Sequence, residues 1–506
     1  NMMVGHEYIW QQSGALTTTV HGLPTGFDSQ TSFNLTTQGF ANSISNFYDP
    51  DDKLLSFFGR ANYDYKSKYL LSATFRADGS SKFSAGNKWG YFPSAAAAWR
   101  VSGEDFMADS KNWLDDLKLR LSYGTAGNNN IPSGQMTQSF ESKTTTWING
   151  FGSYWSASKI MANPDLKWET TVTRNAGIDF SLFNSKLNGS IEGYWNSTVD
   201  LLINFPIPGT GYDSQYRNMG ETRNRGVELS LNWMAINKKN FGLNFSGNIG
   251  FNHNKIMSLG LMDDFGASSG WASTEIGVDY WIATGGSVGQ MYGYVSDGRY
   301  EVTDFKEYNA TTKKWILNDG VADASGVVGA LRPGAMKLKN LTEGDNIVNV
   351  DDRKIIGDAN PLHTGGFTMN GRVYGFDLSA NFNWSFGNDI YNANKVEYTS
   401  TSKYQYRNMI TEMESGKRWT NLNANGTLSN DPAELAALNA NTTMWSPNMD
   451  RYVFSDWAVE DGSFLRLNTL SLGYTLPKSV LNAMKISNLR IYATGYNVFI
   501  LTNYSG

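Results

Sequence analysis

The sequence predicts an all-β protein, a large transmembrane antiparallel β-barrel, and three observations lead to this prediction. Apolar and polar residues alternate along many segments of the 506-residue chain. These segments run for about 10–13 residues, whereas strands of soluble proteins usually have about 5–6. Short and long connections follow one another in turn, as they do at the two ends of a membrane barrel.

The alternation is clearest between Phe376 and Phe386, where every second residue is apolar and the residues between them are Asp, Ser or Asn. A similar pattern occurs in 69–76, 227–233 and 241–252. A period of two places one set of side chains on each face of a strand and excludes a helix. A tilted strand of about 9–11 residues crosses a bilayer. The polar face suits a wet lumen, and aromatic residues near strand ends suit the interfacial girdles.

The composition argues against several other classes of protein. Aromatic residues make up 14% of the chain and charged residues 18%, which argues against disorder. The absence of cysteine excludes a disulfide-stapled domain, and a net charge of −5 argues against a nucleic-acid partner. No stretch reaches the ~18 consecutive apolar residues of a membrane helix, so any predicted crossing is made by strands.

The predicted strands can be placed in order along the chain. They lie near 1–13, 54–65, 69–77, 90–101, 117–125, 172–182, 187–197, 222–234 and 241–253, followed by a hairpin closed by Tyr374-Gly375 and a strand over 489–499. Short turns are expected at 66–68, 184–185, 237–240 and 374–375, with longer ones at 102–116 (helix 113–116) and 476–488 (helix 479–484). Long loops are expected near 14–53, 126–171, 198–221, 255–365 and 388–462. The short turns would face the periplasm and the long loops the exterior.

Strand direction limits how many crossings the segment 255–365 can contain. The chain must be outside at both ends of this segment, so it holds either none or two, with 289–295 the best candidate for one. The sequence therefore predicts roughly 13 or 15 strands. A barrel chain normally ends in the periplasm, and the strand over 489–499 runs outward. We therefore expect a final strand beyond Gly506 and a chain that is part of one longer barrel.

Short motifs follow one another in order along nearly the whole chain. They are FGRANY (58–63), FRADGSSKF (75–83), WGYFPS (89–94), LKLRLSYG (117–124), AGN (126–128), LKWET (166–170), NRGVEL (224–229), SFLRL (463–467), LGYTLP (472–477) and YNVFILTNYSG (496–506). Each motif is weak alone, but the ordered set resembles the SusC/RagA family of TonB-dependent outer-membrane transporters.

The resemblance implies a barrel of about 22 strands around an N-terminal plug domain, in the bacterial outer membrane and in contact with its lipid. It also implies import of oligomeric nutrients, glycan or peptide fragments. TonB, with ExbB and ExbD, would energise import through the N-terminal part, and a SusD-like surface lipoprotein would cap the barrel. Residues 1–506 would then be a partial barrel, with the plug domain and the final strand outside this chain.

The long loops carry aromatic residues that could bind a ligand. Aromatic faces stack on sugar rings or pack against peptide side chains, and Trp and Tyr dominate binding hot spots. The candidates are Trp147, Tyr154, Trp155, Trp271, Tyr280, Trp281 and Trp445. The alternative is that these rings pack their own loops or a lipoprotein lid, because long ordered loops need apolar anchors.

An acidic segment within 339–353 is the candidate for a metal site. Members of the family often carry a calcium-loop-like Asp-x-Asn-x-Asp-Gly run there, and this chain offers Glu343, Asp345 and Asp351. Calcium takes about six to eight oxygen ligands from alternate loop positions, and Ile347 interrupts that spacing. A solvated acidic loop is therefore the competing interpretation, and we expect no other cofactor.

No catalytic pattern stands out in the sequence. The chain lacks the Gly-x-Ser-x-Gly and Walker patterns, and adjacent carboxylates such as Asp351-Asp352 would point to opposite faces of a strand. We therefore expect a transporter rather than an enzyme. Two alternatives stay open: a soluble β-rich carbohydrate-binding module, and a barrel that acts mainly as the scaffold of a surface complex.

Overall fold

The computed structural model describes residues 1–48, 51–144, 153–404 and 406–506. The chain divides into two compact units. Unit 1 comprises Asn1–Asp109, Leu117–Gly177 and Tyr194–Thr222, and unit 2 comprises Ser110–Asp116, Ile178–Gly193 and Arg223–Gly506. Within the described residues, no helix has the length and apolarity needed to cross a membrane.

The main sheet has 13 strands, hydrogen-bonded in the same order in which they follow along the chain. They are β1 (Met2–Gln11), β4 (Asp52–Tyr65), β5 (Tyr69–Ser80), β6 (Trp89–Arg100), β7 (Leu114–Asn128), β11 (Glu169–Leu182), β12 (Leu187–Val199), β15 (Glu221–Asn237), β16 (Phe241–Ser258), β25 (His363–Val373), β26 (Phe376–Phe386), β29 (Phe464–Thr475) and β30 (Arg490–Thr502). All-β architecture and antiparallel pairing, as seen for β4–β5 and β25–β26, agree with the alternation in the sequence.

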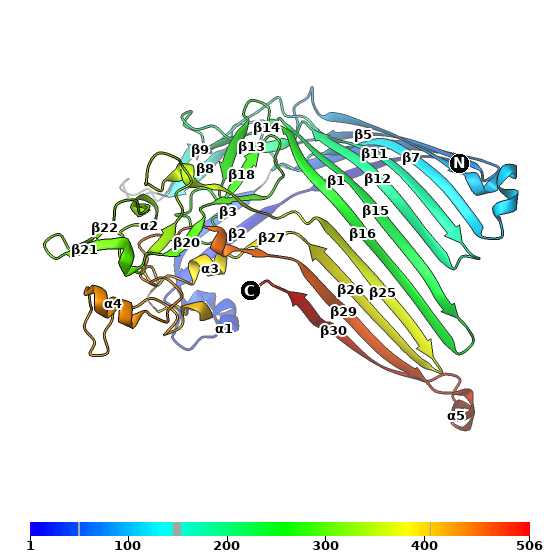
Figure 1. Ribbon diagram of the computed structural model, residues 1–506. Coiled ribbons are helices and arrows are strands. Elements are labelled where there is room, and N and C mark those ends of the chain that lie inside the picture. Colours follow the sequence, from blue (N-terminus) through cyan, green and yellow to red (C-terminus); the bar gives the residue numbers. More distant parts are fainter. Residues whose placement is uncertain (49–50, 145–152, 405) are drawn as a thin grey trace. The chain divides into compact units, whose positions relative to one another are not determined.

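Tight turns join several of these strands. Lys66 and Ser67, with φ of 54° and 53°, close β4 onto β5, and Tyr374 and Gly375, with φ of 47° and 93°, close β25 onto β26. Two successive positive φ values match the twist that a two-residue hairpin needs. In unit 2, Figure 1 shows α5 (Lys478–Ala483) at one end of the β29–β30 hairpin, and α3 (Ala393–Glu397) and α4 (Pro432–Leu438) toward the other.

A carboxylate in the connection between β6 and β7 ties that connection to the start of β5 and the end of β6 in unit 1. Glu104 accepts hydrogen bonds from the Tyr69 hydroxyl at 2.6 Å, from Trp99 Nε1 at 3.0 Å and from Lys68 Nζ at 3.1 Å. These three hydrogen bonds, from Tyr69, then Trp99, then Lys68, lower the pKa of Glu104 to about 2. The ionised form of Glu104 therefore fixes this turn.

The two faces of the sheet in unit 2 differ as the alternation predicts. Phe367 and Phe382 are register partners with stacked rings 4.5 Å apart. The residues that precede and follow them face the other way, and Asn381 Nδ2 donates to Thr368 Oγ1 at 2.8 Å. Ser471 and Thr494 continue the polar set, with their hydroxyls 3.0 Å apart. Aromatic side chains thus line one face, and hydrogen-bonded polar side chains line the other.

The long connections are folded. They contain short strands: β2 (Gly14–His21), β3 (Phe40–Tyr48), β8 (Phe140–Thr144), β9 (Ser153–Ala157), β10 (Ile160–Met161), β13 (Leu202–Pro206), β14 (Ser214–Asn218), β17 (Asp264–Ala267), β18 (Tyr280–Ala283), β19 (Gln290–Gly293), β20 (Ser296–Arg299), β21 (Phe305–Asn309), β22 (Lys314–Leu317), β23 (Met336–Leu338), β24 (Lys354–Asp358), β27 (Asp389–Tyr391) and β28 (Val459–Asp461). They also contain the helices α1 (Ser29–Asn34) and α2 (Ser325–Val328). The 3-10 helices are η1 (Thr36–Gln38), η2 (Val101–Gly103), η3 (Asp105–Ser110), η4 (Val302–Asp304), η5 (Val350–Asp352), η6 (Thr411–Met413) and η7 (Asp456–Ala458).

Two local predictions are wrong. The segment 289–295 does not cross a membrane, because β19 has four residues and pairs with β18 and β24 in a separate four-stranded sheet; four residues span only about 13 Å. All of 259–362 is described, and it adds no strand to the main sheet. The brief helix expected at 113–116 is instead the start of β7. The turn 183–185 holds this segment extended, because Phe183 N donates to Trp113 O at 2.8 Å and Ser185 N to the Asp115 carboxylate at 2.8 Å.

Unit 1 has a hydrophobic core that draws on several of the motifs identified in the sequence. Its buried members are Phe83, Phe92, Ile131, Leu166 and Trp168. Phe83 comes from the FRADGSSKF motif, Phe92 from WGYFPS, and Leu166 and Trp168 from LKWET. Close approach explains the glycine of the AGN motif as well, because a Cβ at Gly127 would overlap the Phe92 ring. These motifs therefore mark a core under the loops of unit 1.

Unit 2 holds two further cores in its loops. The larger core, called core A here, contains Tyr300, Phe305, Leu338, Met413, Trp445 and other buried residues from 300–348 and 413–453. The second, called core B, contains Met291, Tyr391, Tyr452, Phe454 and Ala458 among others. Each core joins segments far apart in the sequence, which explains why these long loops are ordered.

Candidate functional site

Two of the predicted loop aromatics, Trp271 and Tyr280, contact each other in unit 2, and Trp281 follows Tyr280 on β18. The Trp271 ring is 5.7 Å from the Tyr280 ring and 5.7 Å from the Tyr391 ring, measured between centroids. Trp281 contacts Tyr292, with ring centroids 4.7 Å apart. The Trp271 side chain is 60% exposed, so its outer surface is open to a ligand or a partner protein.

A buried carboxylate beside these rings fixes the loop that presents Trp271. Asp279 is fully buried and accepts hydrogen bonds from Ser269 N at 2.8 Å and from Ser269 Oγ at 2.5 Å. Burial, assisted by the charge of Asp279, raises the pKa of Tyr280 to about 12. The phenol of Tyr280 is therefore neutral at physiological pH, and it can donate a hydrogen bond.

Of the remaining candidates, Trp445 and Trp155 do not join this group. Trp445 is 2% exposed and packs edge-on against Trp457, with ring centroids 4.6 Å apart, inside core A. Trp155, on β9 of unit 1, is 73% exposed. Tyr154 precedes it on the same strand, but its side chain, like the whole of Trp147, lies outside the described residues. A ligand-binding role for any of the predicted aromatics stays a prediction, and Trp445 has a packing role in any case.

The acidic segment of 339–353 is organised by a carboxylate that the sequence analysis did not single out. Asp352 is fully buried and accepts hydrogen bonds from the backbone N of Leu341, Thr342 and Asn349 at 2.7, 2.9 and 2.7 Å. Thr342 Oγ1 also donates to it at 3.0 Å. Burial alone would raise the pKa of Asp352, but these hydrogen bonds outweigh it and the pKa is lowered. The capping-box spacing of Asn349 and Asp352 was the available signal.

The three carboxylates proposed for a metal lie around this loop and do not converge. Asp345 accepts from Ile347 N at 3.0 Å, while Glu343 and Asp351 are exposed. Across the described part of the chain, no cluster of three or more His, Cys, Asp or Glu side chains could hold a metal ion. Calcium binding by this loop stays a prediction, and Asp352 accounts for the order of the loop.

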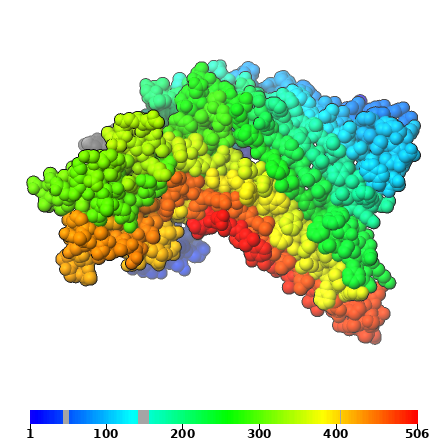
Figure 2. All heavy atoms as spheres, viewed as in Figure 1, coloured from blue at the N-terminus to red at the C-terminus, as the bar shows by residue number. Residues whose placement is uncertain are grey.

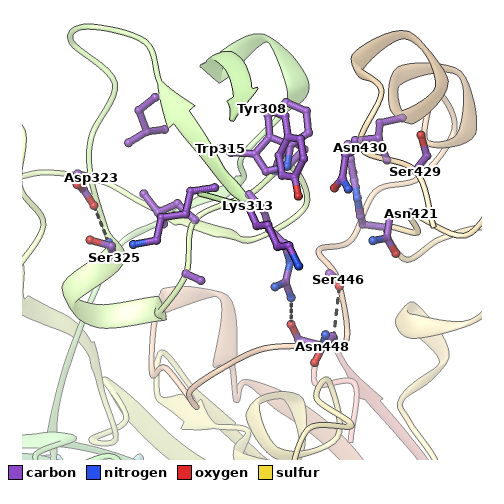
Figure 3. Close-up of a pocket in the computed structure, with 18 residues that line it drawn as sticks. Tyr308, Lys313, Trp315, Asp323, Ser325, Asn421, Ser429, Asn430, Ser446 and Asn448 are labelled. Atoms are coloured by element: carbon purple, nitrogen blue, oxygen red, sulfur yellow. Dashed lines mark hydrogen bonds between the residues drawn. The ribbon is translucent and has the colours of Figure 1, made fainter. Parts of the chain in front are cut away.

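A pocket of about 600 Å³ lies in unit 2 over core A, and no predicted site residue lines it. One wall comes from β21, β22 and the segment 323–333, and the other from 419–435 and 446–448. Figure 2 shows these two parts of the chain side by side, in green and orange. Figure 3 shows Tyr308 and Trp315 on one wall, with Asn421, Ser429 and Asn430 across from them.

The pocket combines aromatic rings, carboxamides and cations. Tyr308 and Trp315 are register partners in the β21–β22 hairpin, with ring centroids 5.5 Å apart. Lys313, Lys314 and Arg332 supply positive charge, Asp323 is the acidic member of the lining, and Asn421, Asn430 and Asn448 supply side-chain amides. Its volume falls within the range of about 300–1,000 Å³ that is typical of ligand pockets.

Sequence reasoning missed this pocket because its two walls are about a hundred residues apart in the chain. One local signal was present in 305–317, where two short apolar-rich segments flank a polar turn and place Tyr308 opposite Trp315. The contribution of 419–448 has no comparable signature.

Comparison with known proteins identifies the group to which the chain is similar. Residues 3–325 match the family model described as TonB dependent receptor-like, beta-barrel. TonB-dependent receptor P3 of Formosa agariphila is 33% identical over 91% of this chain and 42% of its own length. TonB-dependent receptor SusC of Bacteroides thetaiotaomicron is 31% identical over 91% of this chain and 41% of its own length.

A solved structure supports the same fold. The RagAB peptide transporter contains a chain that matches with a TM-score of 0.73 and 24% identity, covering all of this chain and 50% of that one. The chain thus spans about half the length of the relatives that it matches. Because the family model covers most of the chain, and the motifs, the two-faced antiparallel sheet and the named relatives agree with it, this protein belongs to the SusC/RagA-like TonB-dependent receptors of the bacterial outer membrane.

Proposed function

We propose that the protein imports oligomeric nutrients across the outer membrane, energised by TonB and capped by a SusD-like lipoprotein. Membership of the TonB-dependent receptor family is the observation that carries this proposal. The sheet supports it, because an apolar face suits lipid and a hydrogen-bonded polar face suits a wet interior. Family membership favours a transporter over a soluble carbohydrate-binding module.

The proposed mechanism involves capture and conformational change without bond chemistry. The folded loops of unit 2 would bind the oligomer outside the membrane, and the polar sheet face would offer exchangeable hydrogen bonds to a hydrated substrate. The named relatives are receptors and transporters rather than enzymes. Both glycan and peptide fragments fit this proposal. The solved relative is described as a peptide transporter, which is a statement about that protein.

The test is uptake by cells that carry or lack the full-length protein. Fluorescently labelled oligosaccharide and peptide mixtures are supplied, and internal label is compared with and without a protonophore that removes the energy for TonB. We expect uptake of one mixture that depends on both the protein and the proton gradient. Uptake of every mixture unchanged by deletion would contradict import. A co-purifying lipoprotein without any uptake would favour the scaffold alternative instead.

A further inference from the structure

We propose that the pocket over core A is a capture site for an anionic oligosaccharide, such as a chain of uronic acids. This inference rests on the proposed import function and names the substrate class of that function. Three features of the pocket carry it: a paired aromatic surface, uncompensated positive charge, and exposed carboxamides on the opposite wall.

The aromatic surface is held in place by the core beneath it. Trp315 lies between Tyr308 and Phe305, with ring centroids 5.5 Å from each. Phe305 is buried in core A, so the hairpin cannot easily turn these rings away. Both Tyr308 and Trp315 are half-buried and line the pocket. Pre-positioned aromatic faces bind the apolar C–H faces of sugar rings at little entropic cost.

Two of the cations that line the pocket have no ion-pair partner in the part of the chain that the structure describes. Lys306, on the same hairpin, pairs with Asp319 at 2.8 Å, and Lys337 pairs with Asp304 at 3.1 Å. Lys313 and Lys314 line the pocket and are exposed, and within the described residues neither forms an ion pair. A cluster of unpaired cations around a pocket attracts carboxylates or sulfates.

The remaining positive charge and the one acid already have partners. Arg332 donates to the backbone carbonyl of Asn448, which fixes its guanidinium at the edge of the pocket. The Asp323 carboxylate accepts from Ser325 N at 2.8 Å, in the turn that starts α2. The net charge of the lining therefore favours an anion.

The carboxamides favour a glycan over an acidic peptide. Asn421 and Asn430 are exposed on the wall across from the rings, and each amide offers both donors and an acceptor. A sugar ring can place its flat face on the aromatic pair and its hydroxyl rim on these amides at the same time.

The experiment measures binding of α-1,4-linked tetragalacturonate to the full-length protein in detergent by isothermal titration calorimetry. The double variant Lys313→Gln/Lys314→Gln should weaken binding by about tenfold, since two exposed charge contacts at ~0.7 kcal/mol each sum to one decade. The matched control is Lys306→Gln, which removes a cation from the same hairpin outside the pocket. The methyl ester of the same tetramer should bind wild type about as weakly as the acid binds the double variant.

A second variant tests the opposite wall. Asn421→Ala/Asn430→Ala should weaken binding of both the acid and the ester, because these amides would contact hydroxyls rather than carboxylates. Both residues are exposed, so the fold should be retained.

Several results would overturn the proposal. They are equal binding of the acid to wild type and to the lysine variant, equal binding of acid and ester to wild type, or binding of pentaglutamate in preference to the tetramer. Failure of the proposed import function would give a different result from these. Cells would then take up no oligomer, while the purified protein would still bind the tetramer through these lysines.

Discussion

Trp168 offers a quantitative test of the core of unit 1. Its side chain is 8% exposed, with ring centroids 5.5 Å from both Phe83 and Phe92. Its Nε1 also donates to the backbone carbonyl of Lys88 at 2.9 Å. Trp168→Ala removes both the packing and the hydrogen bond, which costs about 3–5 kcal/mol in the free energy of closing this core. Trp168→Phe keeps most of the packing and removes one of the two hydrogen bonds to the Lys88 carbonyl, which still accepts from Ser80 N at 3.0 Å, at a cost of about 0.5–1.5 kcal/mol.

Hydrogen–deuterium exchange on the full-length protein in detergent measures the free energy of opening this core. Local opening controls exchange of the amides in 82–92 and 163–170. A cost of ~4 kcal/mol for Trp168→Ala corresponds to exchange about 700-fold faster, and ~1.4 kcal/mol for Trp168→Phe to about tenfold. Trp155→Ala is the control, because that side chain is 73% exposed and its loss should change stability by less than about 0.5 kcal/mol.

We expect amide exchange in these segments to be fastest in Trp168→Ala, intermediate in Trp168→Phe and close to wild type in Trp155→Ala. If Trp168→Ala exchanged within threefold of wild type in both segments, the side chain would not hold the core together. If Trp168→Phe were as damaging as Trp168→Ala, the hydrogen bond to Lys88 rather than the ring contacts would dominate.

Three further predictions concern single side chains. Gly127→Ala should destabilise unit 1 by about 1–3 kcal/mol, because the new methyl group overlaps the Phe92 ring. Gly371→Ala is the control and should not be destabilising, because the space at that position is open. Equal melting temperatures for the two variants would contradict this prediction. Glu104→Gln should reduce the loss of thermal stability that wild type shows as the pH falls from about 4.5 toward about 2, because the lowered pKa of Glu104 stabilises the folded state only while its carboxylate is ionised. A pH profile that the substitution leaves unchanged would refute this. Asp352→Asn should cost about 1–3 kcal/mol and increase proteolysis within 340–352, and full protection of that loop would count against the role of the carboxylate.

The sheet could be predicted from sequence because its signal is local. Alternation between Phe376 and Phe386 is a property of neighbouring residues, and the division of the strand into an apolar and a polar face follows from it. The segment 289–295 misled the prediction for the same reason: a short alternating stretch looks alike in a crossing strand and in the small sheet that contains β19. Only its partners, β18 and β24, distinguish the two.

The loop cores and the pocket depend on contacts that no local pattern encodes. Trp445 and Trp271 are both loop tryptophans, yet one is enclosed in core A and the other is largely exposed. Adjacent carboxylates diverge in the same way, since Asp352 is fully buried while Asp351 is exposed. These differences arise from the packing of distant segments, which sequence spacing alone does not determine.

The separation between core A and the rim of its pocket has a consequence for how such a receptor can diversify. The side chains that hold the two walls together, such as Phe305 and Met413, are buried, while those that would meet a ligand, Lys313, Asn421 and Asn430, are exposed. Exposed substitutions usually alter stability by less than about 0.5 kcal/mol. The exposed residues at the rim of the pocket can therefore be substituted in many combinations while core A keeps the loops folded. New binding specificities can then arise by one substitution at a time.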